Sequence, residues 1–216
     1  YISVTGVQTC ALPILVTITS SEGMIRLIPE FLWILSCYLV YQVTLEIHHL
    51  IQGRNAGYLT SALPSQNTCG LLAVLTIVAA PIPHILAIGL LPDTLLAPLS
   101  LGLMLMALRW LIQDHFSIRD WIITGLLLGL AGLSKYTAVF SAFALLLVFL
   151  SSPRKAAINT LGFWVAALIA LFCISPVLYW NWINDWVSFK YQVAHGAGGV
   201  WLWRRLIAYV GLQLLV

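Results

Sequence analysis

Long apolar segments recur along the chain, separated by short polar ones. A membrane-spanning helix needs about 20 predominantly apolar residues, and most of these segments are near that length. The pattern therefore predicts several transmembrane helices. Their expected cores are residues 31–45, flanked by 26–30 and 46–49, residues 57–80, interrupted by the polar residues 64–68, and residues 95–112, 158–180 and 201–216.

The apolar segment Trp121–Leu150 is too long for one span. Its 30 residues would make a straight helix about 45 Å long, whereas the hydrocarbon core of a bilayer is about 30 Å thick. Lys135 lies near the middle, and a single tilted helix would hold this cation deep in lipid at a cost of about 3 kcal/mol or more. We therefore predict two short helices that meet at Lys135, near one face of the membrane.

With that break, the polar connections fall alternately on two sides. The first side has short, simply basic loops, which are typical of a cytoplasmic face. The second has acids, histidines and aromatic residues besides its own basic residues, which marks it as the external and working face. The first group is Arg54, Arg109, Arg119, Arg154 and Lys155, and the second is residues 84–93, Lys135 and a predicted long loop at 181–199.

Composition narrows the class of protein. Hydrophobic residues make up 61% of the 216, and only 8% are charged, against about 25% in an average soluble domain. The formal net charge of +3 is spread thinly. So few charges exclude a water-soluble enzyme, a basic nucleic-acid-binding domain and a disordered tail. We therefore expect an all-α protein, a polytopic transmembrane helix bundle.

The first residues stand apart from this pattern. Residues 4–14, with the sequence VTGVQTCALPI, resemble translated sequencing-adapter read-through, and no basic region precedes them as in a signal peptide. We expect residues 1–14 to be non-native. Residues 15–216 are then expected to be part of a multi-helix transmembrane domain that is truncated at both ends.

Asp93 and Lys135 are the candidate catalytic residues. Asp93 follows Pro92 at the start of an apolar segment. It is either an N-cap that stabilises the helix by about 1 kcal/mol, or an acid that orients an acceptor or binds a divalent cation. Lys135 is either a snorkelling lysine or a fixed cation that stabilises an anionic group, such as a lipid phosphate.

The stretch 176–196 combines aromatic residues with an acid, a cation, an amide and a histidine. Interfacial tryptophans need no function, but flat aromatic and hydrogen-bonding side chains also suit a sugar ring or a prenyl chain. Two arginines follow, which either anchor to lipid head groups or hold a phosphate through paired guanidinium groups. The candidate substrate-binding residues are Trp180, Asn181, Asp185, Gln192, His195, Arg204 and Arg205.

Other chemistries find no support in the sequence. It has no Gly-rich phosphate loop, no Ser-His-Asp arrangement and no HExxH helix, so we expect no nucleotide cofactor. The four cysteines are scattered without CxxC spacing, which makes a zinc site or a disulfide framework a weak interpretation. The remaining polar residues are read as solvated loop residues on the cytoplasmic side; they are His48, His49, Asp114, His115 and Asp120.

Three stretches together resemble glycosyltransferase family 39, whose bacterial members are membrane enzymes related to protein O-mannosyltransferases and to the lipid A aminoarabinose transferase. The first is Pro92-Asp93 at the start of an apolar helix. The second, residues 125–137, reads GLLLGLAGLSKYT and is similar to the family's GLxLGLAxLSKYT run. The third, from Pro176 to Gly196, is similar to the family's WN…DW.SF..Q..HG stretch.

The resemblance implies a GT-C-class helix bundle with its active site at the external membrane face. Such enzymes transfer a sugar, with inversion, from a polyprenyl-phosphate donor to a lipid, glycan or protein acceptor. We therefore expect an integral protein of the bacterial inner membrane that faces the periplasm or exterior and binds membrane lipids but no nucleic acid. The family's main acidic base lies in a loop upstream of Arg26, so we expect this segment to be inactive alone.

Two other classes of function stay open. A secondary transporter or permease also uses broken helices with a polar residue at the break, but it needs that residue near the middle of the bilayer. A purely structural membrane subunit would not need Asp93, Lys135 and the polar set of 176–196 on one face.

Overall fold

Seven α-helices make up most of the part of the chain that the computed structural model describes, and no strand occurs in that part. The structure describes residues 22–53, 63–80, 84, 92–113, 115–152, 159–197, 203–204, 207–209 and 211. The helices are α2 (Glu22–Gly53), α4 (Gln66–Ala79), α6 (Pro92–Ile112), α7 (Ile118–Ser134), α8 (Ala138–Ser151), α9 (Leu161–Ile183) and α10 (Val187–Ala197). The predicted all-α class is confirmed.

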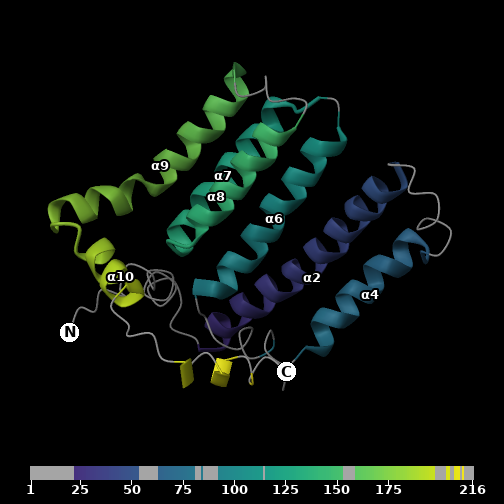
Figure 1. Ribbon diagram of the computed structural model, residues 1–216, viewed down its shortest axis with the longest axis horizontal. Helices are drawn as coiled ribbons and strands as arrows, with labels where there is room; N and C mark the ends of the chain where they lie inside the picture. The colour runs from purple at the N-terminus through teal and green to yellow at the C-terminus, as the bar shows by residue number, and fades with distance from the viewer. Residues whose placement is uncertain are drawn as a thin grey trace.

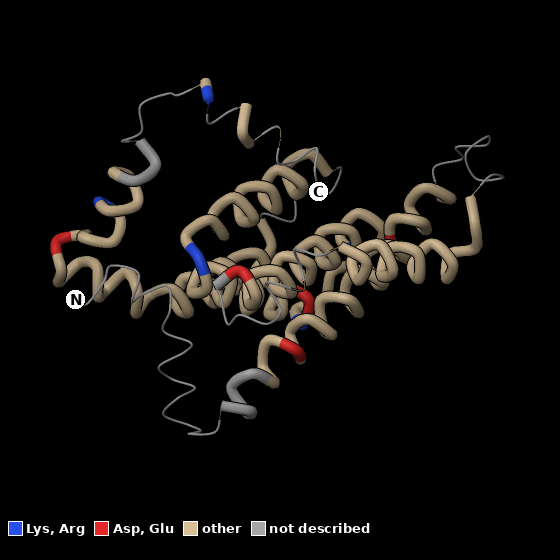
Figure 2. Tube along the Cα trace, turned by 90° about the horizontal axis from the view of Figure 1, so that it is seen from below, with Lys and Arg blue, Asp and Glu red and all other residues tan. Residues whose placement is uncertain are grey.

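Three of the described helices are long and apolar enough to cross a membrane. They contain the segments Leu27–Gly53, Asp93–Ile112 and Leu161–Ile183, while α4 and α8 are shorter apolar helices. Figure 2 shows how few Lys, Arg, Asp and Glu residues interrupt the helical tube. Within the predicted segment 57–80, α4 begins in the polar stretch 64–68, because the Ser65 side chain accepts a hydrogen bond from the Thr68 N–H and caps the helix there. Residues 57–62 lie outside the described residues.

The helices lie side by side in the order α4, α2, α6, α7, α9, and α8 packs against both α6 and α7 (Figure 1). Contacts between numbered residues give their directions. Helix α6 runs antiparallel to α7, because Asp93 meets Lys135 at one end of the pair and Trp110 meets Trp121 at the other. Helices α7 and α9 run parallel. Trp121 packs on Phe163 near both helix starts, and Gly129 lies against Cys173 further along both.

The parallel pair α7 and α9 is packed through small residues. A Cβ atom on Gly125 would lie 2.5 Å from the carbonyl oxygen of Ala166, and one on Gly129 would lie 2.5 Å from the Cβ of Cys173. Such spacing, one small residue every four, lets helix backbones approach closely in a membrane, where dispersion forces drive association. These glycines belong to the GLLLGLAGLSKYT run, so part of that motif is a packing surface.

Aromatic residues form the core at one end of this group of helices. Trp110 of α6 and Trp121 of α7 are each 4% exposed, and their ring centroids lie 5.3 Å apart. Phe149 packs edge-on against Trp110 at 5.0 Å, and Phe163 packs on Trp121. Edge-to-face geometry at these distances is the favourable arrangement for aromatic pairs. These two tryptophans therefore serve the core rather than mark a water interface.

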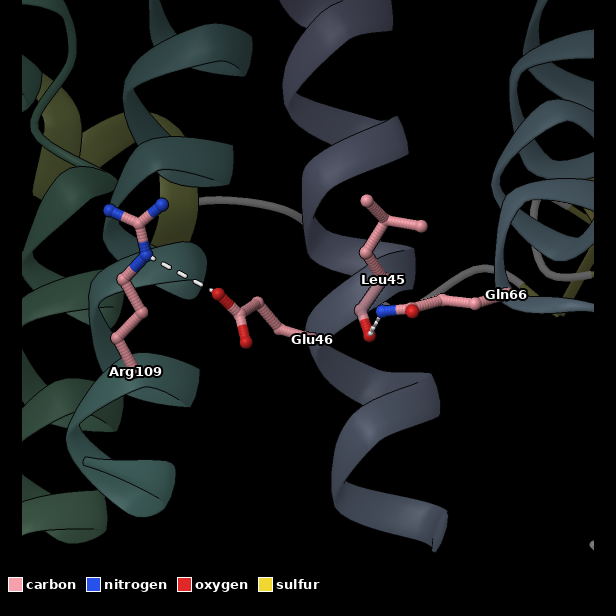
Figure 3. A network of polar contacts seen from close by, with 4 residues as sticks. All are labelled: Leu45, Glu46, Gln66 and Arg109. Atoms are coloured by element: carbon pink, nitrogen blue, oxygen red, sulfur yellow. Dashed lines mark hydrogen bonds and ion pairs between the residues drawn. The ribbon is translucent and has the colours of Figure 1, made fainter.

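Helix α2 links α4 to α6 at that same end through polar contacts (Figure 3). Arg109 Nε donates to Glu46 Oε1 at 3.4 Å, and Gln66 Nε2 donates to the carbonyl oxygen of Leu45 at 3.0 Å. His48, expected in a solvated loop, is instead buried in α2, with its Nε2 3.2 Å from the carbonyl oxygen of Pro64. The prediction for His48 was wrong because the start of α4 covers it.

The helical group thus has two ends, which we name after Lys135 and Arg109. Asp93 and Arg109 are sixteen positions apart on α6, which corresponds to about 24 Å. Asp93 and Lys135 lie at the Lys135 end, whereas Glu46, Arg109 and the aromatic core lie at the Arg109 end. The two groups of the sequence analysis therefore separate where the structure describes them. Arg54, Arg154 and Lys155 lie outside the described residues, as do residues 1–14 and most of 201–216.

Candidate functional site

Asp93 and Lys135 form an ion pair at the Lys135 end. Lys135 Nζ donates to Asp93 Oδ1 at 2.7 Å, across 42 positions of the chain. The lysine side chain is 32% exposed and the aspartate side chain 45%. Asp93 lies in the first turn of α6, which begins at Pro92, so its carboxylate also lies at the positive end of that helix dipole. Neither sequence interpretation of Asp93 includes this pairing.

The predicted break at Lys135 is confirmed, and it explains where the ammonium lies. Helix α7 ends at Ser134 because Lys135 adopts an extended backbone, and the Lys135 N–H makes the last hydrogen bond, to the Ala131 carbonyl oxygen at 3.1 Å. The Ala138 N–H then donates to the Lys135 carbonyl oxygen at 3.0 Å, which starts α8. A break of three residues, 135–137, therefore turns the chain back and leaves the lysine at a helix end.

The Lys135 ammonium could still bind an anion while it is paired with Asp93. An ammonium group has three N–H donors, and Asp93 accepts from one of them. Both side chains remain partly exposed, so a phosphate oxygen could approach the ammonium beside the carboxylate. Hydrogen bonds between charged groups are about twice as strong as neutral ones, which makes such a lysine a competent phosphate ligand.

The predicted long loop at 181–199 is wrong, because the structure has two helices joined by a tight turn there. Helix α9 continues to Ile183, and α10 starts at Val187. The Trp186 N–H donates to the Asn181 carbonyl oxygen at 2.8 Å, which is the longer bond of a Schellman cap. Asp185 and Trp186 have φ of 52° and 57°, where glycine is usual, so the turn stores strain of about 1 to 2 kcal/mol per residue.

This turn directs α10 back toward the break at Lys135. The ring of Phe189 in α10 lies 4.9 Å from the ring of Tyr136, the residue that follows Lys135. Ser188, beside Phe189, is 1% exposed. Three buried side-chain atoms of this region have no hydrogen-bond partner among the described residues: the Tyr136 hydroxyl oxygen, Asn181 Oδ1 and Ser188 Oγ.

The predicted substrate-binding residues separate into an interior and an exposed group. Asn181 is 0% exposed, and its Nδ2 donates to the Val177 carbonyl oxygen at 3.0 Å, so it braces the end of α9. Trp180 is 37% exposed. The structure places Asp185, Gln192 and Arg204 on the surface, and His195 within α10. Arg205 lies outside the described residues.

The sequence indicates both members of the ion pair, but it gives no sign of the contact between Tyr136 and Phe189 or of the burial of Ser188. Tyr136 belongs to the same polar break as Lys135, so its place in the SKYT run was an available signal. Ser188 and Phe189 stand in the third family-like stretch, yet nothing local indicates that Phe189 contacts Tyr136, 53 positions earlier.

A divalent cation was the one cofactor left open. Among the described residues, no group of three or more His, Cys, Asp or Glu side chains could hold a metal ion. Asp93 has Lys135 as its neighbour instead of a second carboxylate. The described side chains alone therefore make no metal site, and the cation remains a prediction.

A family model matches more than half of the chain. The family model described as dolichyl-phosphate-mannose-protein mannosyltransferase matches residues 58–180. That range includes Asp93, the break at Lys135 and α9 as far as Trp180. No curated protein and no solved structure matches the chain.

Proposed function

The chain belongs to the dolichyl-phosphate-mannose-protein mannosyltransferase family, and on that premise we propose that it acts through Lys135, at the membrane face where Asp93 lies. Membership makes it an integral membrane protein of a glycosyltransferase family that uses polyprenyl-phosphate sugars. Beyond this, we propose that the Lys135 end faces the periplasm or exterior of a bacterial plasma membrane. The acceptor is a lipid, a glycan or a protein.

The proposed reaction is a single displacement with inversion. An acceptor hydroxyl oxygen attacks the anomeric carbon, and the bond between that carbon and the phosphate oxygen breaks. The electron pair leaves with the polyprenyl phosphate, and the hydroxyl proton passes to a carboxylate base. Lys135 stabilises the charge that develops on the leaving phosphate.

The observation that carries this proposal is the place of Lys135. It stands in a break between two antiparallel helices, at the same helix end as Asp93 and with part of its side chain exposed. A transporter would need such a cation near the middle of the bilayer. The position at a helix end supports the transferase over the transporter.

Asp93 acts in this proposal as the counter-ion that neutralises Lys135 when no phosphate is bound, and a different carboxylate is the main base. The 2.7 Å contact supports this role because it holds the ammonium at one point while two N–H groups can turn to a ligand. Removing the carboxylate charge should then leave phosphate affinity unchanged or raise it, since one repulsive charge is lost. If Asp93 instead held a bridging cation, its loss would lower the affinity.

The test is the affinity of the chain for a polyprenyl phosphate in phosphatidylcholine nanodiscs. We expect Lys135→Met to weaken binding about 10- to 100-fold, the value of hydrogen bonds to a charged group. Lys190→Met is the matched control, because Lys190 is an exposed lysine of α10 and should change affinity less than about 3-fold. Equal affinities for the wild type and Lys135→Met would refute the role of Lys135.

Asp93→Asn completes the experiment. The counter-ion role predicts an affinity equal to or above the wild-type value, with no effect of a chelator. A loss of affinity that a chelator reproduces in the wild-type chain would assign Asp93 to a cation instead.

A further inference from the structure

The three-residue break at 135–137 is held by contacts on two sides. Lys135 reaches Asp93 of α6, whereas the next residue, Tyr136, packs its ring on Phe189 of α10, with 4.9 Å between the ring centroids. Lys135 has an extended backbone, in which successive side chains point to opposite sides. The break therefore sends one side chain to α6 and the next to α10.

The contact with Phe189 holds the side chain of Tyr136. The tyrosine hydroxyl has no hydrogen-bond partner among the described residues, so its orientation depends on the packing of the ring. The backbone on both sides is part of the break: the Lys135 carbonyl oxygen accepts from the Ala138 N–H at 3.0 Å, and the Tyr136 carbonyl oxygen accepts from the Val139 N–H at 3.1 Å. A ring that is held in place therefore also fixes the backbone that carries Lys135.

A strained turn brings Phe189 to the break. Asp185 and Trp186 both have positive φ, which is costly for a residue with a Cβ atom. Such conformations persist only where surrounding contacts over-determine them, and they cluster near functional sites. Here the Trp186 N–H is bonded to the carbonyl oxygen of the fully buried Asn181, and the Trp186 ring packs on Phe189 at 5.5 Å. The turn therefore fixes the direction in which α10 leaves α9.

One side of α10 faces inward, and Phe189 belongs to it. Ser188 is 1% exposed and Phe189 is partly buried. A phenylalanine side chain has no hydrogen bond and no charge to offer a phosphate, so it can contribute to the site only through the residue that it contacts. The other side of the helix is exposed at Val187, Lys190, Gln192, Val193 and Ala194.

We propose that Phe189 is a positioning residue for Lys135. It holds Tyr136, and thereby keeps the break in the shape from which the ammonium binds a phosphate beside Asp93. This inference rests on the proposed function and adds a residue of α10 to the same site. The stem of a lysine is flexible, so the reach of its ammonium depends on where its backbone is fixed. Binding groups lose affinity when the packing that supports them is removed.

Phe189→Ala tests the proposal, and Phe189→Tyr is the variant that keeps a ring. The dissociation constant for a polyprenyl phosphate is measured in phosphatidylcholine nanodiscs, with the corresponding polyprenol as the ligand that lacks phosphate. We expect Phe189→Ala to weaken phosphate binding about 3- to 10-fold and to leave polyprenol binding unchanged, while Phe189→Tyr retains the wild-type affinity. Equal losses for phosphate and polyprenol would overturn the inference, because Lys135 would then not be the group affected.

The Lys135→Met background distinguishes positioning from a separate effect. If Phe189 acts through Lys135, Phe189→Ala should change phosphate affinity less than about 2-fold once the ammonium is absent. The same fold-loss in both backgrounds would mean that Phe189 acts independently of Lys135, and the positioning role would be wrong.

Phe163→Ala is the matched control for stability. Phe163 packs edge-on against Trp121 at 5.9 Å, at the Arg109 end, so its loss also removes an aromatic contact but leaves the break intact. Both alanine variants should have lower thermal midpoints, and only Phe189→Ala should lose phosphate affinity. A similar loss in Phe163→Ala would attribute the effect to general destabilisation and refute the inference.

The two proposals fail separately. An unchanged affinity in Phe189→Ala, together with a loss in Lys135→Met, overturns the positioning role and leaves the role of Lys135. An unchanged affinity in Lys135→Met overturns the role of the lysine itself, and the positioning role falls with it.

Discussion

Replacing glycine by alanine should have opposite effects at two positions of α7, because the two glycines meet different parts of α9. At Gly125, an added Cβ atom would lie 2.5 Å from the carbonyl oxygen of Ala166 and 2.8 Å from its Cα, both backbone atoms. At Gly132, it would lie 2.7 Å from Cδ1 and 2.9 Å from Cγ1 of Ile174, both side-chain atoms. Backbone can yield only if the whole helix moves, whereas an isoleucine can change its rotamer.

The magnitudes follow from two terms. Replacing glycine by alanine inside a helix favours folding by about 1 kcal/mol, and this gain applies at both sites. Overpacking against a fixed backbone costs about 1 to 3 kcal/mol, and here an ordinary contact distance is violated by about 1 Å. We therefore expect Gly125→Ala to destabilise the chain by about 1 to 2 kcal/mol. Gly132→Ala should be neutral or stabilising by up to about 1 kcal/mol.

Thermal unfolding of the two variants in the same nanodiscs, followed by tryptophan fluorescence, measures the difference. A change of 1 kcal/mol moves the midpoint by about 2 to 4 °C in a chain of this size. The midpoint of Gly125→Ala should therefore fall by several degrees, while that of Gly132→Ala stays or rises. Midpoints that move equally, or a larger loss at Gly132, would refute the close backbone approach of α7 and α9.

Two further predictions concern helix ends. Asp185→Gly should raise the thermal midpoint by the equivalent of about 1 kcal/mol, because glycine adopts the left-handed φ of 52° without strain. Asp185→Val should lower the midpoint. A glycine variant no more stable than the wild type would contradict the strained turn. Asp120→Ala should lower the free energy of unfolding by about 1 kcal/mol in the same assay, because it removes half of the capping box with Ser117 at the start of α7. Arg119→Ala is the neighbouring control. An Asp120→Ala variant as stable as the wild type would contradict the cap.

The break at Lys135 could be predicted because both of its causes lie within one segment of the sequence. The apolar segment is longer than a bilayer is thick, and a cation near its middle is expensive in lipid. Both facts are visible in the sequence, and the structure places the break at 135–137. The all-helical class follows from the same reasoning, since backbone polar groups in lipid must be satisfied within their own helix.

The region after Trp180 could not be predicted in the same way. Its mixed polar and aromatic residues have no clear period, so the sequence predicts a loop there. Helix α10 exists because Asn181, fully buried, supports a left-handed turn without glycine and because Phe189 packs on a distant tyrosine. Those contacts stabilise conformations that local propensity disfavours.

The sequence by itself determined that this protein is a helical membrane protein with a basic residue at a helix break, because hydrophobicity, length and the cost of a charge in lipid act within each segment. Only the tertiary structure decided which residues share the site. Asp93 is separated from Lys135 by 42 positions, and Tyr136 from Phe189 by 53. Such pairs depend on which helices are neighbours and in what direction they run, and the close approach of small residues on α7 and α9 settles that for the second pair.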